Sequence, residues 1–267
     1  MDVFTDTPYL GNPVAVVLGA DGLSGERMQL FARWTNLSET TFVLAPRADG
    51  ADYRVRIFTP TGELPFAGHP TLGTCHAWLE AGGLPADKGA IVQECEAGLI
   101  TVRSAEPGLA FAAPPLVRSG PVEDAVTERV ARALNIARAD IADIAWADNG
   151  PGWVAVLLAS AEAVLAIRPG VVDLDIGVAG RYPAGSPEAV EVRAFSPKIT
   201  SVEDPVTGSL NASLGQWLLA TGRATAPYVA SQGTAMGRRG RVHVSCDDGQ
   251  VWVGGGTVTC VSGTVEL

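Results

Sequence analysis

The hexapeptide VRIFTP at residues 55–60 recurs as VRAFSP at residues 192–197. A second pair of blocks continues the match, because HPTLGT at residues 69–74 is answered by DPVTGS at residues 204–209. Separated blocks that match in the same order indicate an internal repeat. The two hexapeptides and the blocks that follow them therefore predict that the chain is built from two similar halves.

The repeat extends over nearly the whole chain. Each second block runs into an apolar, helix-like segment that ends in glycine, at residues 72–82 and 210–222. Further matching segments are residues 12–17 with 151–156, and two predicted hairpins, 98–102 with 109–111 and 240–244 with 251–253. We therefore expect halves at residues 1–118 and 145–267, joined by a helical connection at residues 119–144.

The local hydrophobic pattern predicts an α+β fold, with strands around one central helix in each half. Apolar alternation with a period of two predicts strands at residues 53–58 and 190–195. Helical spacing of apolar residues predicts further helices at residues 26–35 and 122–134.

The repeat aligns His69-Pro70 with Asp204-Pro205 at the starts of the two central helices. Proline costs little in the first turn of a helix, because its missing N–H has no intrahelical partner there. We expect Asp204 at or near the N-cap position. If a pseudo-twofold axis relates the halves, both helix N-termini face one crevice. There, free N–H groups and the helix dipole favour a substrate carboxylate.

Composition excludes several classes of partner. Among 267 residues, 29 Asp and Glu stand against 19 Lys and Arg, and the formal net charge is −10. We expect neither nucleic acid nor an anionic membrane as a partner, since both are bound mainly through their phosphates. The acidic start and the lack of a long apolar run predict a cytoplasmic protein. Three histidines and four scattered cysteines form no metal-ligand motif, and no P-loop or dinucleotide fingerprint occurs. We therefore expect no metal and no other cofactor.

Three motifs, in order, resemble those of the PhzF-like isomerases of phenazine biosynthesis: NLSETTF at residues 36–42, PFAGHPT at 65–71 and EDPVTGS at 203–209. The segments 2–5 and 11–13 fit this family too. The resemblance spans essentially the full length and implies a diaminopimelate epimerase-like α+β fold. In that fold, two pseudo-symmetric domains each wrap a barrel-like, mostly antiparallel sheet around a central helix. The resemblance also implies a homodimer and cofactor-independent isomerisation of a small carboxylate-bearing substrate in the interdomain cleft.

Carried over residue by residue, the resemblance implies that Glu39 is the general acid–base and that His69 and Asp204 are its catalytic partners. It assigns substrate binding to Ser38, Gly68, Gly208 and Ser209. A carboxylate base works best with its pKa raised towards neutrality, as in a buried apolar site. Position alone leaves a structural alternative for each residue: Glu39 at the exposed start of a strand, His69 bonded to a carbonyl, Asp204 as a helix cap, Ser209 bonded to the backbone.

Two other functions stay open. Racemases and epimerases of the wider superfamily use one cysteine from each half, at the helix N-termini, but positions 68, 69, 204 and 208 hold none here. A non-catalytic binding protein that kept the cleft would take up a small molecule without exchanging its protons. Relatives usually carry histidine where this chain has Asn211, a change that can alter what the cleft accepts.

Overall fold

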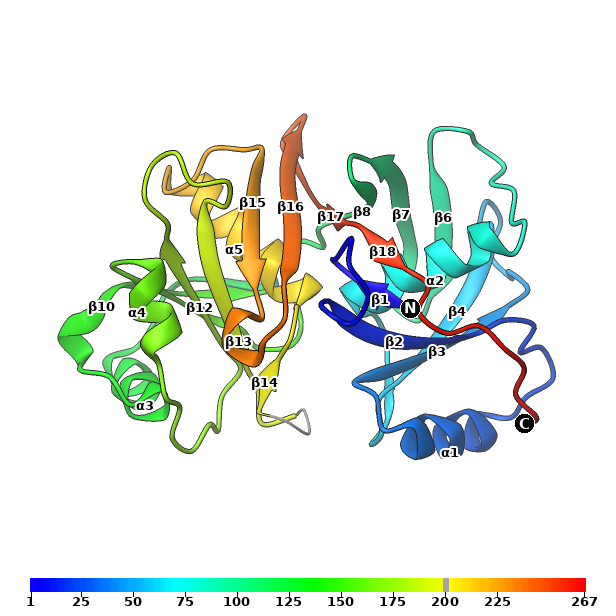
Figure 1. Cartoon of the computed structure of the whole chain (residues 1–267), viewed down its shortest axis with the longest axis horizontal. Coiled ribbons are helices and arrows are strands. Elements are labelled where there is room, and N and C mark those ends of the chain that lie inside the picture. The colour runs from blue at the N-terminus through cyan, green and yellow to red at the C-terminus, as the bar shows by residue number, and fades with distance from the viewer. Residues whose placement is uncertain (199–201) are drawn as a thin grey trace. The chain divides into compact units, whose positions relative to one another are not determined.

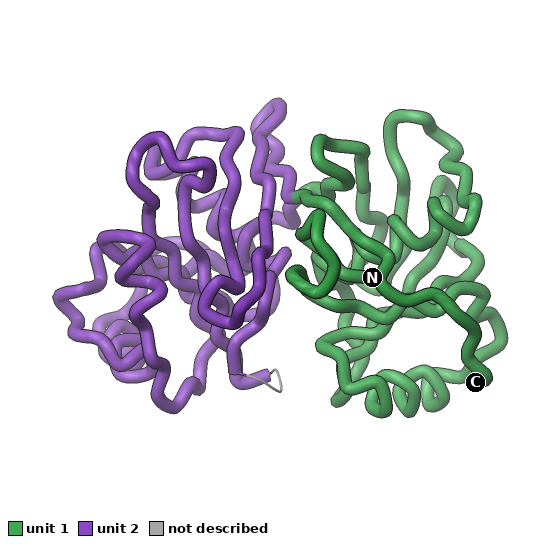
Figure 2. The backbone as a smooth tube through the Cα atoms, viewed as in Figure 1, with its two compact units in different colours: residues 1–112, 254–267 green, residues 113–253 purple. Residues whose placement is uncertain are grey.

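The computed structural model describes residues 1–198 and 202–267, which form two compact units (Figure 1). Unit 1 comprises Met1–Ala112 and Gly254–Leu267, and unit 2 comprises Ala113–Val253 (Figure 2). This division differs from the expected halves. The predicted connection at residues 119–144 is a strand and a helix of unit 2, and the end of the chain returns to unit 1. The reason for the return is strand pairing, because β18 (Thr257–Val258) is antiparallel to β1 (Asp2–Val3).

Unit 1 is a curved mixed sheet around a central helix. Its strands follow the order β18, β1, β2, β3, β4, β6, β7, β8, with parallel pairing only at β2–β3 and β4–β6 among these. The short β5 pairs antiparallel with β4. Helix α2 (Gly68–Glu80) packs against β1, β2, β3, β6, β8 and β18, so the sheet surrounds it. The remaining bounds are β2 Asn12–Val17, β3 Glu39–Leu44, β4 Tyr53–Phe58, β5 Glu63–Leu64, β6 Ile91–Cys95, β7 Gly98–Ala105 and β8 Gly108–Ala112.

Unit 2 repeats this topology. Its strands follow the order β9, β10, β11, β12, β13, β15, β16, with parallel pairing at β11–β12 and β13–β15, and β14 pairs antiparallel with β13. Helix α5 (Gly208–Ala220) packs against β10, β12 and β16. The bounds are β9 Arg118–Pro121, β10 Ile141–Asp148, β11 Val154–Leu158, β12 Ile176–Arg181, β13 Val190–Phe195, β14 Glu203–Asp204, β15 Tyr228–Gln232 and β16 Gly240–Asp247. The last strand before β18, β17 (Gln250–Gly255), begins in unit 2 and ends in unit 1. The predicted α+β fold, with a barrel-like sheet around a central helix in each unit, is confirmed.

Other helices cover the outer faces of the sheets. In unit 1, α1 (Gly25–Thr35) is capped by the Ser24 side chain, which accepts a hydrogen bond from Arg27 N, and it ends at Asn36 in the left-handed region. Its buried face packs on Phe42 and Phe58. In unit 2, two helices contribute to the corresponding apolar layer, which includes Phe195. They are α3 (Asp124–Leu134) and α4 (Ala161–Ala166), and two 3₁₀ turns, η1 (Arg138–Asp140) and η2 (Thr234–Met236), complete the unit.

The central helices correct the predicted alignment of the repeat. Because α2 begins at Gly68 and α5 at Gly208, the counterpart of His69 is Ser209 and not Asp204. Asp204 is also not the N-cap of α5, a position that Thr207 occupies. The physical reason is strand pairing: Asp204 lies opposite Ala194 of β13, so the chain is extended there and turns into a helix only after Thr207.

No helix in the described ranges is both long and apolar enough to span a bilayer.

Candidate active site

Three side chains of unit 1 meet at the start of its central helix. Asn12 is the first residue of β2, Glu39 the first of β3, and His69 the second of α2. The parallel strands β2 and β3 run in register, with Val14 opposite Glu39, so their starts lie at the same edge. Nε2 of His69 lies 3.3 Å from Oε2 of Glu39, and Nδ1 lies 3.4 Å from the Asn12 side-chain amide. The strand register therefore brings Asn12 and Glu39 to one edge of the sheet, and the start of α2 places the His69 imidazole beside the carboxylate.

The imidazole of His69 is neutral in this setting. Its side chain is 5% exposed, and that of Glu39 is 14% exposed. Burial lowers the pKa of His69 to about 3, although the nearby Pro13 carbonyl, which could accept a hydrogen bond from the ring, opposes the shift. The contact with Glu39 is therefore not an ion pair at neutral pH. Nε2 of His69 forms no hydrogen bond within the described structure, so the approach is a close contact of two groups that can share a proton.

The predicted substrate-binding residues of unit 1 adjoin this pair. Ser38 directly precedes Glu39 and is half-buried, while Gly68 is the first residue of α2 and is buried. The N-cap Ala67 supplies no side-chain hydrogen bond, and the first turn of α2 has no acidic residue. Such an uncapped helix start favours an anionic group near its N–H groups.

In unit 2, the start of α5 is held by Gln232 of β15. Its carbonyl oxygen accepts from the backbone N of Thr207 at 3.0 Å and from the Asn211 amide at 2.8 Å. Its amide nitrogen donates to the Asp204 carbonyl at 3.1 Å and to Thr207 Oγ1 at 2.9 Å. One buried amide thus uses all its hydrogen-bonding capacity to fix the loop that carries Asp204 and Gly208. Gln232 was not among the predicted site residues, because no local motif marks a glutamine in a distant strand.

The other predicted residues of unit 2 lie on or beside this loop. The half-buried Asp204 accepts a hydrogen bond through Oδ2 from Thr207 Oγ1 at 2.6 Å. Gly208 is the buried first residue of α5. Ser209 follows it, and its Oγ accepts a hydrogen bond from the indole N–H of Trp153 at 3.1 Å. The structure thus brings Asp204, Gly208 and Ser209 to one end of unit 2.

The strand register also identifies the counterpart of Glu39 in unit 2. Thr40 lies opposite Phe58 in unit 1, and Ile176 lies opposite Phe195 in unit 2, so Glu39 and Asp175 precede equivalent positions. Their surroundings differ. The buried Asp175 accepts hydrogen bonds from Ser196 Oγ at 2.5 Å and from the Lys198 ammonium at 2.6 Å, whereas Glu39 faces a neutral ring. Because the Asp175 carboxylate is engaged by an ammonium and a hydroxyl, the acid–base candidate of this pair is Glu39.

Comparison with known proteins agrees with this architecture. The sequence model of the PhzC-PhzF family, described as phenazine biosynthesis-like protein, matches residues 1–263. The chain belongs to this family. It is 37% identical over 286 residues to antisense-enhancing sequence 1 of Schizosaccharomyces pombe, covering 98% of this chain and 96% of that protein. It is 35% identical over 278 residues to a trans-2,3-dihydro-3-hydroxyanthranilate isomerase of Pseudomonas fluorescens, covering 100% of this chain and 98% of that protein.

Solved structures of the PhzF family share the fold. A PhzF family phenazine biosynthesis protein of Bacillus anthracis superposes with a TM-score of 0.80 at 26% identity, over 95% of this chain and 93% of that one. The predicted resemblance to the PhzF family is therefore confirmed, and so is the fold class that it implies.

Thiol chemistry finds no support in this PhzF-family chain. Cys75 is buried two turns into α2, and burial raises its pKa to about 12, so it stays protonated. Burial also raises the pKa of Cys95, which ends β6. Cys246 is exposed and Cys260 is partly exposed, and both lie outside the first turns of the central helices. Over the described ranges, no three His, Cys, Asp or Glu side chains are grouped as metal ligands would be.

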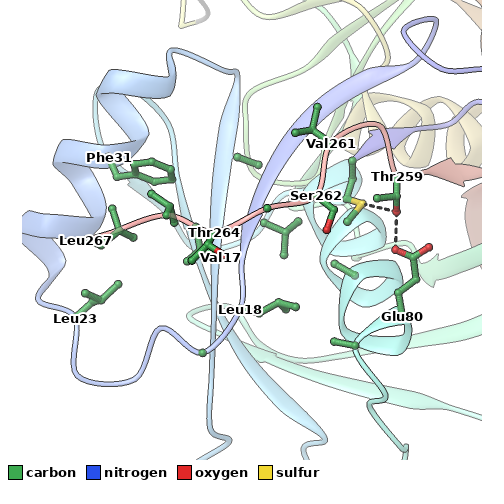
Figure 3. A pocket seen from close by; sticks show the side chains of 18 of the residues that line it. Val17, Leu18, Leu23, Phe31, Glu80, Thr259, Val261, Ser262, Thr264 and Leu267 are labelled. Carbon is green, nitrogen blue, oxygen red and sulfur yellow. Dashed lines mark hydrogen bonds between the residues drawn. The ribbon is translucent and has the colours of Figure 1, made fainter.

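A cavity of about 860 Å³ lies elsewhere in unit 1, beneath the C-terminal segment (Figure 3). Its walls include Val17, Leu18, Phe31 and Leu267, with Glu80 at one end. The Thr259 hydroxyl donates a hydrogen bond to that carboxylate at 2.5 Å and anchors the segment. None of the predicted site residues lines this cavity, so its size does not make it the catalytic site.

Proposed function

We propose that the chain is a cofactor-independent isomerase of the PhzF type. In this proposal, Glu39 moves a proton between two carbon atoms of a small, carboxylate-bearing cyclic diene. The observation that carries the proposal is the contact of 3.3 Å between the Glu39 carboxylate and the buried, neutral ring of His69. Family membership and the relatives named as isomerases support the same reaction class.

The proposed reaction uses one carboxylate and leaves the elemental composition of the substrate unchanged. As its carboxylate form, Glu39 takes a proton from a C–H bond that is acidified by the neighbouring double bonds. The electron pair of that bond shifts along the diene, and the protonated Glu39 returns the proton to another carbon. Substrate and product are then isomers, and the base is regenerated. His69 lies against the Glu39 carboxylate, with Nε2 3.3 Å from Oε2, and keeps it in place.

The carboxylate of the substrate needs its own binding groups, separate from Glu39. We propose that the N–H groups at the starts of α2 and α5, at Gly68 and Gly208, serve this purpose together with Ser38 and Ser209. Asp204 would orient the substrate from its place before α5. Support comes from the fixed loop around Gln232 and from the uncapped start of α2.

A proton-exchange assay in D₂O tests the proposal. Trans-2,3-dihydro-3-hydroxyanthranilate is the first compound to offer, because the Pseudomonas fluorescens relative is named for it. An isomerase gives a new structural isomer that carries solvent deuterium at the new C–H position. A racemase instead exchanges deuterium and inverts one centre of the same compound. Tight binding of this compound, together with no proton exchange in it or in related cyclic amino acids, would overturn the proposal. The chain would then be a binding protein.

A further inference from the structure

The ring of His69 is held between an amide and a carboxylate. We propose that Asn12 is a positioning residue that keeps the hydrogen of the neutral His69 ring on Nε2, the nitrogen that contacts Glu39. The catalytic consequence rests on the proposed function, whereas the protonation state of the ring does not.

The backbone of Asn12 is held by strand pairing, and its side chain is buried. Asn12 is fully buried, begins β2 and lies opposite Val3 of β1 in the antiparallel ladder. Pro13 follows it and restricts its backbone to extended conformations, as the strand requires. A side chain on such a rigid element holds its amide in one place, 3.4 Å from Nδ1 of His69.

A neutral imidazole has one N–H donor and one bare acceptor nitrogen. The Asn12 amide nitrogen donates, so the ring nitrogen that faces it must be the acceptor, which leaves the hydrogen on Nε2. On the other side, Nε2 faces Oε2 of Glu39 at 3.3 Å. If Nε2 were bare, its lone pair would face those of an ionised carboxylate and repel them. Both neighbours therefore select the same tautomer.

The opposite tautomer has one acceptor available. A hydrogen on Nδ1 could be donated to the Pro13 carbonyl, which lies within hydrogen-bonding reach of the ring. That state would leave the donor of Asn12 facing another donor and would present a bare Nε2 to Glu39. The amide of Asn12 thus sets the balance between a ring that presents an N–H group to Glu39 and a ring that presents a bare nitrogen to it.

The duplicated unit supports the role of Asn12 as a hydrogen-bond donor to the second residue of the central helix. Ser209 is the counterpart of His69 in α5, and its hydroxyl accepts from the indole N–H of Trp153 at 3.1 Å. Trp153 directly precedes β11, which is the counterpart of β2 in unit 2. In each unit, an N–H donor at the start of the equivalent strand, β2 or β11, contacts the side chain of the second residue of the central helix.

Nitrogen-15 NMR of the imidazole rings tests the inference on the whole chain without a substrate. The wild-type protein is recorded between pH 5 and 8, and the His69 signals are assigned by their loss in His69→Gln. We expect a protonated, pyrrole-type Nε2 and a bare, pyridine-type Nδ1 throughout. A hydrogen on Nδ1, or rapid averaging of the two tautomers, would overturn the proposal.

The variant Asn12→Asp replaces the hydrogen-bond donor beside Nδ1 of His69 by an acceptor, because an ionised carboxylate only accepts hydrogen bonds. The hydrogen should move to Nδ1, and kcat should fall by up to about 10²–10⁴-fold with KM little changed. The matched control is Asn211→Asp, which places the same change at the buried asparagine of unit 2 and should leave the His69 signals as they are. Unchanged His69 signals in folded Asn12→Asp, or equal changes in the control, contradict the proposal. If the tautomer switches as expected while the wild type turns over no substrate, the proposed function fails and the assignment of Asn12 stands.

Discussion

The Glu39 carboxylate and the His69 imidazole approach to 3.3 Å, although the two residues, in the first position of β3 and the second of α2, are 30 positions apart in the chain. Because the buried ring stays neutral down to a pH of about 3, we propose the carboxylate, and not the ring, as the group that moves a proton.

Glu39→Gln should lower kcat by about 10²–10⁴-fold and change KM little, because glutamine keeps the shape but carries no transferable proton. The measurement is the rate of deuterium incorporation into substrate in D₂O. Glu63→Gln is the control, since Glu63 is a glutamate of the same unit that pairs with Arg56 instead of His69. Near-native turnover in Glu39→Gln together with loss of turnover in His69→Gln would transfer the role of base to His69.

His69 should make the protein less stable as the pH falls. Its folded-state pKa of about 3 lies below the ordinary value of 6.5. Between these two pH values, the unfolded chain binds a proton at His69 that the folded chain does not. Stability therefore falls as the pH drops through this window, by up to about 1.4 kcal/mol per pH unit, and is unaffected by His69 above it. Urea unfolding at pH 7 and pH 5 should show a smaller loss for His69→Gln than for the wild type. Equal losses would mean that the ring is not held neutral by burial.

Asp204→Asn should impair turnover more than stability. The asparagine oxygen can still accept the hydrogen bond from Thr207 Oγ1, so we expect a loss in the free energy of unfolding below about 1 kcal/mol. A carboxylate that orients the substrate would be missing, and kcat/KM should fall. Thr207→Val is the comparison, because it removes the hydroxyl that bonds Asp204 and Gln232 and should cost mainly stability. Full kcat/KM in Asp204→Asn would show that Asp204 is structural.

The duplicated ion pairs offer a matched test of burial. Arg56 pairs with Glu63 in unit 1, where both side chains are about 30% exposed. Arg193 pairs with Glu203 in unit 2 at 5% and 12% exposure. Glu203→Gln should cost about 3–5 kcal/mol in the free energy of unfolding, because it strands a buried guanidinium, whereas Glu63→Gln should cost about 1 kcal/mol or less. Denaturant unfolding of both variants measures this difference, and equal costs would show that burial does not decide the strength of the pair.

Exhaustive chelation should leave turnover intact. Over the described ranges, no group of three ligand-type side chains surrounds a point where a metal ion could sit. The assay compares deuterium incorporation before and after dialysis against EDTA. Activity that is lost and then returns with one divalent ion would replace the carboxylate mechanism with a metal-assisted one.

Local pattern was enough to predict the elements and the pairing candidates. The strands predicted at residues 53–58 and 190–195 are β4 and β13 with the same bounds, because apolar alternation is a property of neighbouring residues. The predicted helix at residues 26–35 is α1 within one residue. The motifs around Glu39 and His69 marked both residues before their contact was known. Repeated blocks in one order predicted the duplication itself.

Tertiary structure decided which residues meet. Asn12 reaches His69 across 57 positions of the chain, and Gln232 holds the Thr207 backbone across 25 positions, contacts that follow from strand register and helix position alone. Register also makes Asp175 the counterpart of Glu39, and the helix starts pair His69 with Ser209 where sequence identity had paired it with Asp204. The physical reason is common to all of these. A repeat in sequence records similar residues, whereas hydrogen bonding between strands fixes which residues are extended, where a helix can begin, and which side chains then face one another.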